Sequence, residues 1–325
     1  MTHDAAYATN IHVRNIVRPV LNKVDPGRRM RLALSELCRK PRYLGLRVHV
    51  PNVGNVEIRK RITERVPFAA GKFGAGESKL YRMCRPRRSG QRSLVSRSFM
   101  DQIYIQAGLF PRDQETMRWF SGLYADVGRA VDLLGIWFQD GEIYLVRDNN
   151  LEATCTFFGF TGLEPYYFDE AWSHALKGRK VLVISPFSAS IASQYRRRDK
   201  VWPNGLLPEI ELSCLTFPHS KALADNNYSS WREIYESFCN EMEALDFDIA
   251  LIGAGAASLP LAVHAKRLGR QGIGLGGSLQ LMFGIIGRRW ETHPVFAARV
   301  NEYWTRPSGN EVPLKRMLVE NGAYW

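Results

Sequence analysis

The stretch Phe247–Ser278, FDIALIGAGAASLPLAVHAKRLGRQGIGLGGS, combines a strand, a glycine turn, a helix and a second strand in one continuous run. The apolar run at 247–252 predicts a buried strand, 257–268 has helical spacing, and 271–276 predicts the next strand. Two strands joined by a helix pair in parallel, so both glycine turns are expected at one edge of the same sheet.

The glycine turns partly match the fingerprint of dinucleotide-binding proteins. This fingerprint needs three glycines and an acidic residue at the end of the second strand. Gly253 and Gly255 are present, but Ser258 stands at the third position, and the second strand ends at Gly276 and Gly277 without an acid. The pattern disfavours NAD or FAD. It leaves two turns whose backbone amides suit an anion such as a diphosphate. The alternative is that these glycines only permit tight packing of helices on the sheet.

The same alternation of strands and helices covers the rest of the chain from about residue 60. Strands and helices in this order predict an α/β fold with a Rossmann-like, mostly parallel sheet that carries helices on both faces. Expected strands, some with their turns, lie at 66–74, 135–138, 142–146, 180–187 and 209–217, and expected helices begin near 77, 113, 167, 188 and 229.

Charge is distributed unevenly along the 325 residues, whose net charge is +12. Residues 1–98 carry 22 Lys and Arg against 6 Asp and Glu, whereas the remaining residues carry 22 against 26. We therefore expect residues 1–60 to form a basic helical arm and residues 61–325 to form the main domain. A cationic region of this kind attracts nucleic acid, an anionic membrane or a phosphorylated substrate, and the alternative is a solvated surface.

Other features of the chain indicate a cytoplasmic protein with reduced thiols. No apolar run approaches the roughly 20 residues that cross a bilayer, and the N-terminus lacks the apolar centre of a signal peptide. The five cysteines are odd in number, scattered and without a CxxC pair. No GxSxG, GxxxxGK[ST] or HExxH pattern occurs, which disfavours several hydrolase, kinase and histidine–metal classes.

A further glycine-rich turn lies near the beginning of the main domain, in the sequence GKFGAGE at 71–77. Its glycines follow an expected strand, and Glu77 begins the next helix. A glutamate at a helix start commonly interacts with the helix dipole, but at the edge of a sheet it can instead act as a base or bind a metal.

Several ordered motifs resemble a known family. GKFGAGE, followed by the stretch 248–290, resembles the bacterial GT-D-fold glycosyltransferases, and KVLVISPFSASIASQYRRR, NEYWTRPS and NGAYW resemble a branch of polysaccharide-cluster proteins that shares this domain. The resemblance covers about residues 66–325. It implies transfer of a sugar from a nucleotide-sugar donor to a glycan or lipid-linked acceptor in surface polysaccharide biosynthesis. A basic arm could then contact the inner face of the membrane.

The family places an Asp-X-Glu pair, associated with a divalent metal, in the first glycine turn. Here the sequence is Ala75-Gly76-Glu77, so Glu77 matches and Ala75 replaces the aspartate. One carboxylate binds a hard cation less well than two, which leaves Mn²⁺ or Mg²⁺ at Glu77 as an open alternative. Ser185 also departs from the family, whose members often have histidine before the Pro-Phe pair.

These patterns give a hypothesis for the site. The two later glycine turns would hold the donor diphosphate through their amides, and Glu77 would act as the base or as a metal ligand. Cations would offset the charge on the departing diphosphate, and Arg306, next to Tyr303 and Trp304, is the strongest of them. The donor-binding residues expected are Gly71, Lys72, Gly74, Ser185, Arg196, Arg197, Gly253, Ala254, Gly255, Ala256, Gly276, Gly277 and Ser278.

Alternatives remain for several of these residues. Arg196 and Arg197 also fit the solvated last turn of a helix, and the aromatic residues Trp290, Tyr324 and Trp325 fit either a core or a sugar-stacking surface. At the level of the whole protein, the second function class is a nucleic-acid-binding or anionic-membrane-binding protein that uses its basic first third. No recognisable nucleic-acid-reading motif accompanies those basic residues.

Overall fold

The computed structural model describes residues 42–43, 45–85, 94–297 and 299–325. The chain divides into two compact units, residues 1–48 and 49–325. In the first unit, β1 (Arg42–Tyr43) and β2 (Leu46–Arg47) form a short antiparallel pair. Most of the basic arm expected at 1–60 lies outside the described residues, so its helical character stays a prediction.

The second unit is built on a seven-stranded sheet in which all neighbouring strands are parallel, in the order β5-β4-β3-β9-β8-β6-β7. This confirms the predicted α/β class. The strands are β3 (Phe68–Gly71), β4 (Leu133–Ile136), β5 (Thr156–Gly159), β6 (Lys180–Ser185), β7 (Glu211–Thr216), β8 (Ile249–Ile252) and β9 (Gln271–Gly274).

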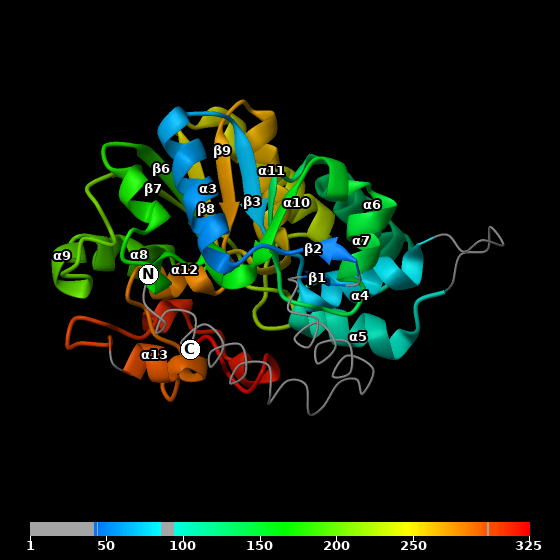
Figure 1. Cartoon of the computed structure of the whole chain (residues 1–325). Coiled ribbons are helices and arrows are strands. Elements are labelled where there is room, and N and C mark those ends of the chain that lie inside the picture. Colours follow the sequence, from blue (N-terminus) through cyan, green and yellow to red (C-terminus); the bar gives the residue numbers. More distant parts are fainter. Residues whose placement is uncertain (1–41, 44, 86–93, 298) are drawn as a thin grey trace. The chain divides into compact units, whose positions relative to one another are not determined.

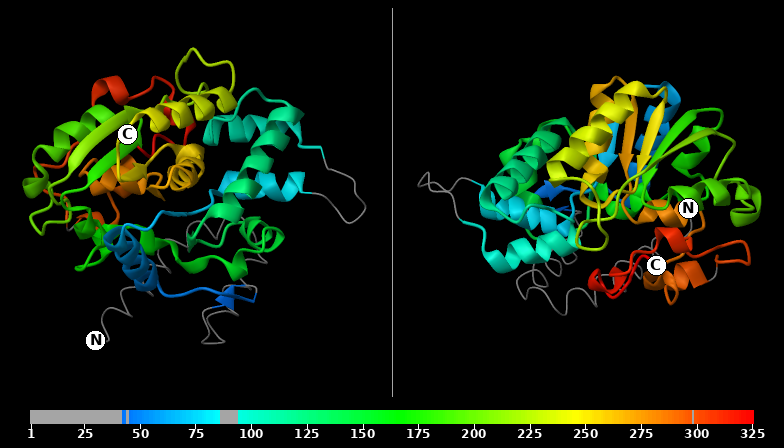
Figure 2. Two further views of the ribbon diagram at one scale, coloured as in Figure 1. Left: turned by 90° about the horizontal axis from the view of Figure 1, so that it is seen from above. Right: turned by 180° about the vertical axis from the view of Figure 1, so that it is seen from behind.

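Helices cover both faces of this sheet. Figure 1 shows α3 in front of the strands and α10 and α11 behind them, and Figure 2 shows the same layers from above and from behind. The α-helices are α3 (Pro51–Glu64), α4 (Ala75–Cys84), α5 (Arg97–Gln106), α6 (Gln114–Ala130), α7 (Glu142–Asp148), α8 (Ser188–Tyr195), α9 (Arg198–Val201), α10 (Trp231–Ala244), α11 (Ser258–Arg267), α12 (Ser278–Met282) and α13 (Pro294–Ala297). Within the described ranges, no helix has both the length and the apolar character that crossing a bilayer requires.

Short 3₁₀ helices complete the second unit. They are η1 (Leu151–Ala153), η2 (Phe160–Leu163), η3 (Pro165–Tyr167), η4 (Trp172–Leu176), η5 (Gly255–Ala257), η6 (Arg288–Trp290), η7 (Gly309–Glu311) and η8 (Arg316–Leu318). Of these, η2 directly follows β5 and η5 lies in the turn after β8, at the carboxyl ends of their strands.

Helix α3 belongs to the second unit, although most of it lies in the range 1–60 expected for the basic arm. It begins with Pro51 at its first position, buries Ile58 and Ile62 on one face, and continues to Glu64. Gly54 allows close contact with β5, because a Cβ there would lie 2.1 Å from Phe158. Residues 49–60, which the charge pattern assigns to the arm, therefore belong to the second unit. The division between the two units falls at 48/49.

The core on the α3 face of the sheet combines residues from distant parts of the chain. Ile58 and Ile62 of α3 belong to the same buried cluster as Phe68 of β3, Phe158 of β5 and Trp172 of η4, all fully or almost fully buried. Burying one isoleucine side chain stabilises a fold by about 1.5–3 kcal/mol. This packing makes α3 an integral layer of the second unit.

Two segments differ from the sequence expectation. Residues 142–146 were expected as a strand but lie in helix α7, and residues 167–176 were expected as a helix but form 3₁₀ turns. Glu142 accepts hydrogen bonds from the amides of Phe138 (3.0 Å) and Gln139 (3.3 Å), and Gly141 turns the chain with φ of 95°. A short apolar run does not by itself distinguish a strand from a buried helix, and here the preceding turn determines the helix.

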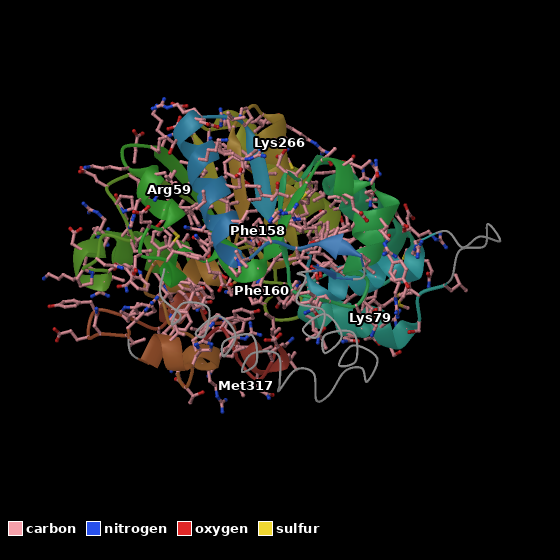
Figure 3. All side chains as sticks on the ribbon, in the orientation of Figure 1. Arg59, Lys79, Phe158, Phe160, Lys266 and Met317 are labelled. Atoms are coloured by element: carbon pink, nitrogen blue, oxygen red, sulfur yellow. The ribbon has the colours of Figure 1, made fainter. Side chains whose placement is uncertain are left out.

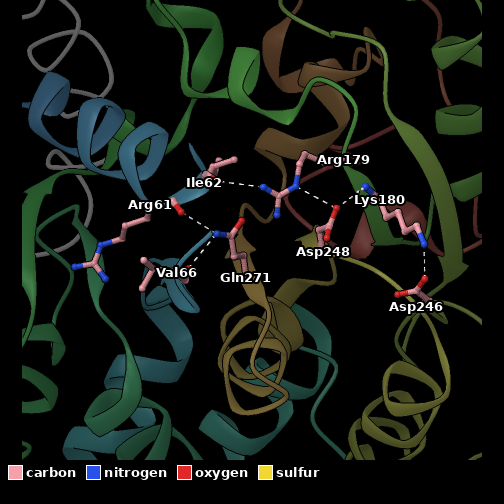
Figure 4. Close-up of polar contacts among 8 residues, drawn as sticks. All are labelled: Arg61, Ile62, Val66, Arg179, Lys180, Asp246, Asp248 and Gln271. Carbon is pink, nitrogen blue, oxygen red and sulfur yellow. Dashed lines mark hydrogen bonds and ion pairs between the residues drawn. The ribbon is translucent and has the colours of Figure 1, made fainter. Parts of the chain in front are cut away.

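The amino-terminal edge of the sheet is closed by paired polar groups, shown in Figure 4. Arg179 donates to Asp248 (3.1 Å) and to the carbonyl of Ile62 (3.1 Å), and the backbone amide of Lys180 donates to the same Asp248 oxygen (2.9 Å). Gln271 donates to the carbonyl of Arg61 (2.8 Å). These contacts fasten α3 to β6, β8 and β9 at the edge away from the glycine turns.

Candidate functional site

The candidate site lies at the carboxyl edge, where the connections of two neighbouring strands diverge. Strand β6 continues through α8 and α9 to β7 on one side, whereas its neighbour β8 continues through α11 to β9 on the other side. Diverging connections leave a crevice between the loops, and ligands of open parallel sheets bind in such crevices. The chain topology therefore identifies this point before any side chain is considered.

A cavity of about 170 Å³ occupies this position. Its walls contain the turns that follow four strands, together with the end of α5, part of α10 and the C-terminal residues Val319, Tyr324 and Trp325. Large rings dominate the apolar part of the lining. They are Phe187, Phe217, Trp231, Tyr324 and Trp325.

The glycine turns after β8 and β9 lie against each other and both line the cavity. A Cβ on Gly253 would lie 2.9 Å from the carbonyl oxygen of Gly276, so only glycine allows this approach. Gly255 and Gly276 have positive φ values of 54° and 58°. The sequence prediction that both turns meet at one edge is correct.

Some amides of these turns are already used. The amide of Ala254 donates to the hydroxyl of Ser258 (2.9 Å), which occupies the third glycine position of the fingerprint. In the described part of the chain, no hydrogen-bond acceptor is found for the amides of Gly255, Ala256 and Gly277, all of which line the cavity. Unpaired backbone amides beside a cavity are a binding surface for an anion.

His219 lines the cavity from the turn after β7 and was not among the residues expected from the sequence. Its Nε2 lies 2.9 Å from the carbonyl oxygen of Glu311, which can only accept, so Nε2 carries the proton. Burial lowers the pKa of His219, and Glu311 opposes this effect. The lowered pKa favours the neutral ring, and in this tautomer Nδ1 is the unprotonated nitrogen.

The beginning of α8 does not offer an anion site. The carboxylate of Glu311 accepts hydrogen bonds from the amides of Ala189 (2.9 Å) and Ser190 (3.1 Å), in the first turn of α8. Ser185 lines the cavity, as expected for a donor-binding residue, and its hydroxyl accepts from the amide of Phe187 (3.1 Å). Glu311 thus fixes α8 and, through its carbonyl group, His219.

Glu77 lies outside the lining of the cavity, which differs from the role expected for it. Its carboxylate folds back over Gly74, where a Cβ would lie 2.0 Å from Oε2, at the start of α4. Burial raises the pKa of Glu77, and hydrogen bonds from the amides of Glu77 and Gly76 oppose the rise. Glu77 also raises the pKa of Tyr124, after the larger effect of burial, and Tyr124 donates to the carbonyl of Ala256 (2.8 Å). Tyr124, whose pKa the charge of Glu77 helps to raise, thus contacts the β8 turn.

The described residues at Glu77 do not fit a hard divalent cation. Ala75 supplies no ligand, and the Glu77 carboxylate is used by amides of its own helix. In the described residues there is also no group of three or more His, Cys, Asp and Glu side chains that could hold a metal.

Lys72 lies in a polar cluster beside the β9 turn. Its ammonium group is 4.9 Å from the ring centre of Trp137 and 5.0 Å from that of Phe160. Burial lowers the pKa of Lys72, and the charge of Glu164 is the strongest opposing influence. Glu164 is buried and accepts from the hydroxyl of Ser278 at 2.5 Å. Ser278 and Glu164 are thus in direct contact, and the charge of Glu164, which was not among the expected residues, also acts on Lys72.

Two expected glycines have packing roles. A Cβ on Gly71 would lie 2.7 Å from Leu259 and 3.2 Å from the carbonyl of Gly274, and Gly74 leaves space for the Glu77 carboxylate. Neither glycine lines the cavity. Packing therefore accounts for these two glycines of the first turn, whereas the later turns, for which tight packing is the stated alternative, combine packing with an open cavity wall.

The expected arginines lie away from the cavity lining. Arg196 and Arg197 are exposed at the end of α8, and Arg197 donates to Gln194 (2.6 Å). Arg306 is exposed, pairs with Glu291 and donates to the main-chain oxygen of Trp325 (3.1 Å). Arg306 thus supports a wall residue of the cavity but does not line it.

The site residues that the sequence did not predict are positioned by contacts with distant segments of the chain. His219 follows a strand in the sequence FPHS, a signal that could have drawn attention to it. Gln280 lines the cavity and donates to the carbonyl of Tyr324 (3.1 Å), which fixes the C-terminal wall. The charge of Arg289 contributes to lowering the pKa of Lys72, and its guanidinium group lies 5.1 Å from the ring centre of Tyr324.

Comparison with known proteins adds no relative: no family model, no curated protein and no solved structure matches this chain.

Proposed function

We propose that the protein is a glycosyltransferase of GT-D type that moves a sugar from a nucleotide-sugar donor to a hydroxyl group of a glycan or lipid-linked acceptor. The observation that carries this proposal is the cavity at the diverging connections, where unpaired amides, aromatic rings and a neutral histidine lie together. A nucleoside diphosphate sugar presents anionic, aromatic and polyhydroxyl parts, which match these three kinds of group. The motif resemblance supports the same assignment.

In this proposal, the amides of Gly255, Ala256 and Gly277 bind the donor diphosphate. Rings of the cavity wall stack on the base or on the sugar, as Trp and Tyr commonly do. The charge of Glu164 acts on Lys72, and Glu164 accepts a hydrogen bond from Ser278 beside the β9 turn. The positive charge of Lys72 therefore favours binding of a diphosphate at that turn. Burial of Glu164 and Ser278 strengthens electrostatic interactions in this cluster.

His219 is proposed as the general base in place of Glu77. Its Nδ1 accepts the proton of the acceptor hydroxyl while that oxygen forms a bond to the anomeric carbon of the donor. The bond between the anomeric carbon and the diphosphate oxygen breaks, and the nucleoside diphosphate leaves with the electron pair. Glu77, through Tyr124, is assigned a positioning role at the β8 turn.

Thermal denaturation with added nucleotides tests this function. Uridine and guanosine diphosphates, alone and as sugar conjugates, are added to the full chain, and the cognate nucleotide is expected to stabilise it by about 2.7 kcal/mol at a concentration of 100 Kd. The matched control is Gly277→Ala, whose Cβ would lie 2.8 Å from the Tyr324 ring and disturb the proposed diphosphate turn. Absence of stabilisation by every nucleoside diphosphate and nucleotide sugar would contradict the proposal.

Duplex DNA is the control for the second function class. Binding that weakens steeply with salt, without any nucleotide effect, would favour a nucleic-acid-binding protein instead.

A further inference from the structure

A cluster of exposed apolar side chains lies in the C-terminal segment, next to the cavity. Leu314 is 95% exposed, Met317 51% and Leu318 52%, all within five residues. The other large exposed apolar side chains of the described chain are Val50, Val56 and Val66, in or beside α3, together with Leu94 and Val300. We call residues 313–319 the apolar loop.

The apolar loop is a folded element. The amide of Arg316 donates to the carbonyl of Pro313 (3.1 Å), and that of Val319 donates to the carbonyl of Arg316 (3.1 Å). Pro313 and Val319 are buried at its two ends. Figure 3 places Met317 at the bottom of the second unit and Lys266 toward the top. The exposed side chains are therefore held outward by an anchored turn.

Cations alternate with these apolar groups. Lys315 and Arg316 are exposed within the loop, and Arg288 is exposed and donates to the carbonyl of Asn321 (3.4 Å), close in sequence to the loop. For none of these three cations is an acidic partner found among the residues that the structure describes. Their charge is available for an external anion.

We propose that the apolar loop docks the protein on an anionic membrane surface. Leu314, Met317 and Leu318 would enter the boundary between headgroups and acyl chains, while Lys315 and Arg316 contact lipid phosphates. A bilayer surface presents apolar and anionic groups side by side, which matches this alternation. The core of a protein interface is a poorer match, because lysine is depleted there.

Docking here brings the site close to the membrane. Val319, at the end of the loop, lines the cavity together with Tyr324 and Trp325. If the proposed function is correct, the cavity would meet a lipid-linked acceptor at the surface that carries it. This consequence rests on the proposed function, whereas the docking itself does not.

Co-sedimentation of the full chain with vesicles tests the docking. Vesicles of phosphatidylcholine alone are compared with vesicles that contain phosphatidylglycerol, and binding is expected only to the anionic ones. The triple variant Leu314→Ser, Met317→Ser, Leu318→Ser is expected to lower the partition coefficient at least tenfold, because three apolar side chains no longer insert. Lys315→Glu with Arg316→Glu is expected to lower it by a similar factor.

Two controls separate this loop from general effects. Leu94→Ser removes another exposed apolar side chain, and Lys60→Glu with Lys177→Glu makes the same charge change elsewhere on the surface. Both are expected to bind vesicles as the unchanged protein does. Nucleotide stabilisation, measured on the triple variant, is expected to persist, so that failure of docking and failure of the proposed function are distinguishable.

Three results would overturn the docking. These are no binding of the unchanged protein to anionic vesicles, a partition coefficient of the triple variant within twofold of the unchanged value, or an equal loss in the controls. A dimer that the triple variant converts to a monomer, with vesicle binding unchanged, would assign the loop to a second copy of the chain.

Discussion

The two edges of the central sheet differ in how their polar groups are paired. At the amino-terminal edge, Arg179 and Gln271 donate hydrogen bonds to carbonyl groups of α3, and Arg179 also pairs with Asp248 (Figure 4). At the carboxyl edge, amides of the glycine turns and Nδ1 of His219 lie beside a cavity. Paired polar groups stabilise a fold, whereas unpaired groups beside a cavity reduce stability and can bind a ligand. The same sheet therefore has one edge suited to stability and one suited to binding.

The largest effect that would sharpen this contrast is expected at His219. His219→Gln keeps a donor for the carbonyl of Glu311 but removes the basic nitrogen, so kcat is expected to fall about 10²- to 10⁴-fold with little loss of stability. Steady-state transfer assays and circular dichroism measure the two effects. Glu77→Gln is the matched control, and a larger loss of kcat in Glu77→Gln than in His219→Gln would return the base to Glu77.

The pH profile gives an independent check of the same residue. Because burial lowers the pKa of His219, the base is neutral and active above that pKa, and kcat is expected to fall only as the pH drops below the ordinary histidine value of about 6.5. Stability changes in the same direction, because the unfolded chain binds the proton more readily in this pH range. A profile in which kcat rises as the pH falls from 7 to 6 would contradict the assignment.

At the amino-terminal edge, a change should affect stability and not activity. Arg179→Met leaves the carbonyl of Ile62 and the Asp248 carboxylate without their arginine partner, so the free energy of unfolding is expected to decrease by about 1–3 kcal/mol. Chemical denaturation measures it. Arg232→Met breaks an exposed pair with Glu236 and is expected to cost less than about 1 kcal/mol. Equal losses in the two variants would break the comparison.

Lys72 tests whether the polar cluster belongs to the binding edge. Lys72→Met removes the cation near the β9 turn and is expected to weaken nucleoside diphosphate binding about tenfold, which corresponds to about 1.4 kcal/mol. Calorimetric titration measures the change. Lys79→Met, on the neighbouring helix α4, is the matched control and is expected to bind as the unchanged protein does. Similar affinity in both variants would remove Lys72 from the donor site.

The smallest effect is expected at Arg196, which lies exposed at the end of α8 and outside the cavity lining. Arg196→Ala is expected to change the free energy of unfolding by less than about 0.5 kcal/mol and to leave nucleotide binding unchanged. Denaturation and titration of this variant measure both quantities. A clear loss of nucleotide affinity would extend the site beyond the cavity.

Much of the fold follows from local sequence. The strands β6, β7, β8 and β9 and the helices α10 and α11 lie close to the expected ranges, because buried parallel strands are continuous apolar runs and their helices have a regular period. Strand β5 and helix α5 are not predicted from the sequence. Residues 142–146 are predicted as a strand but form a helix, because the conformation of short segments depends on their tertiary surroundings. The place of α3 also required the packing of Ile58 and Ile62.

The sequence alone determined that glycine turns end neighbouring parallel strands, because glycine and apolar runs specify local backbone geometry. It could not determine which charged residues meet at those turns. Tertiary structure turned Glu77 back onto its own helix and brought His219 to the cavity through a carbonyl 92 positions away, whereas the exposed helix end of Arg196 matches an alternative already given by the sequence. Long side chains depend on contacts between distant segments, and residue spacing along the chain carries no information about those contacts.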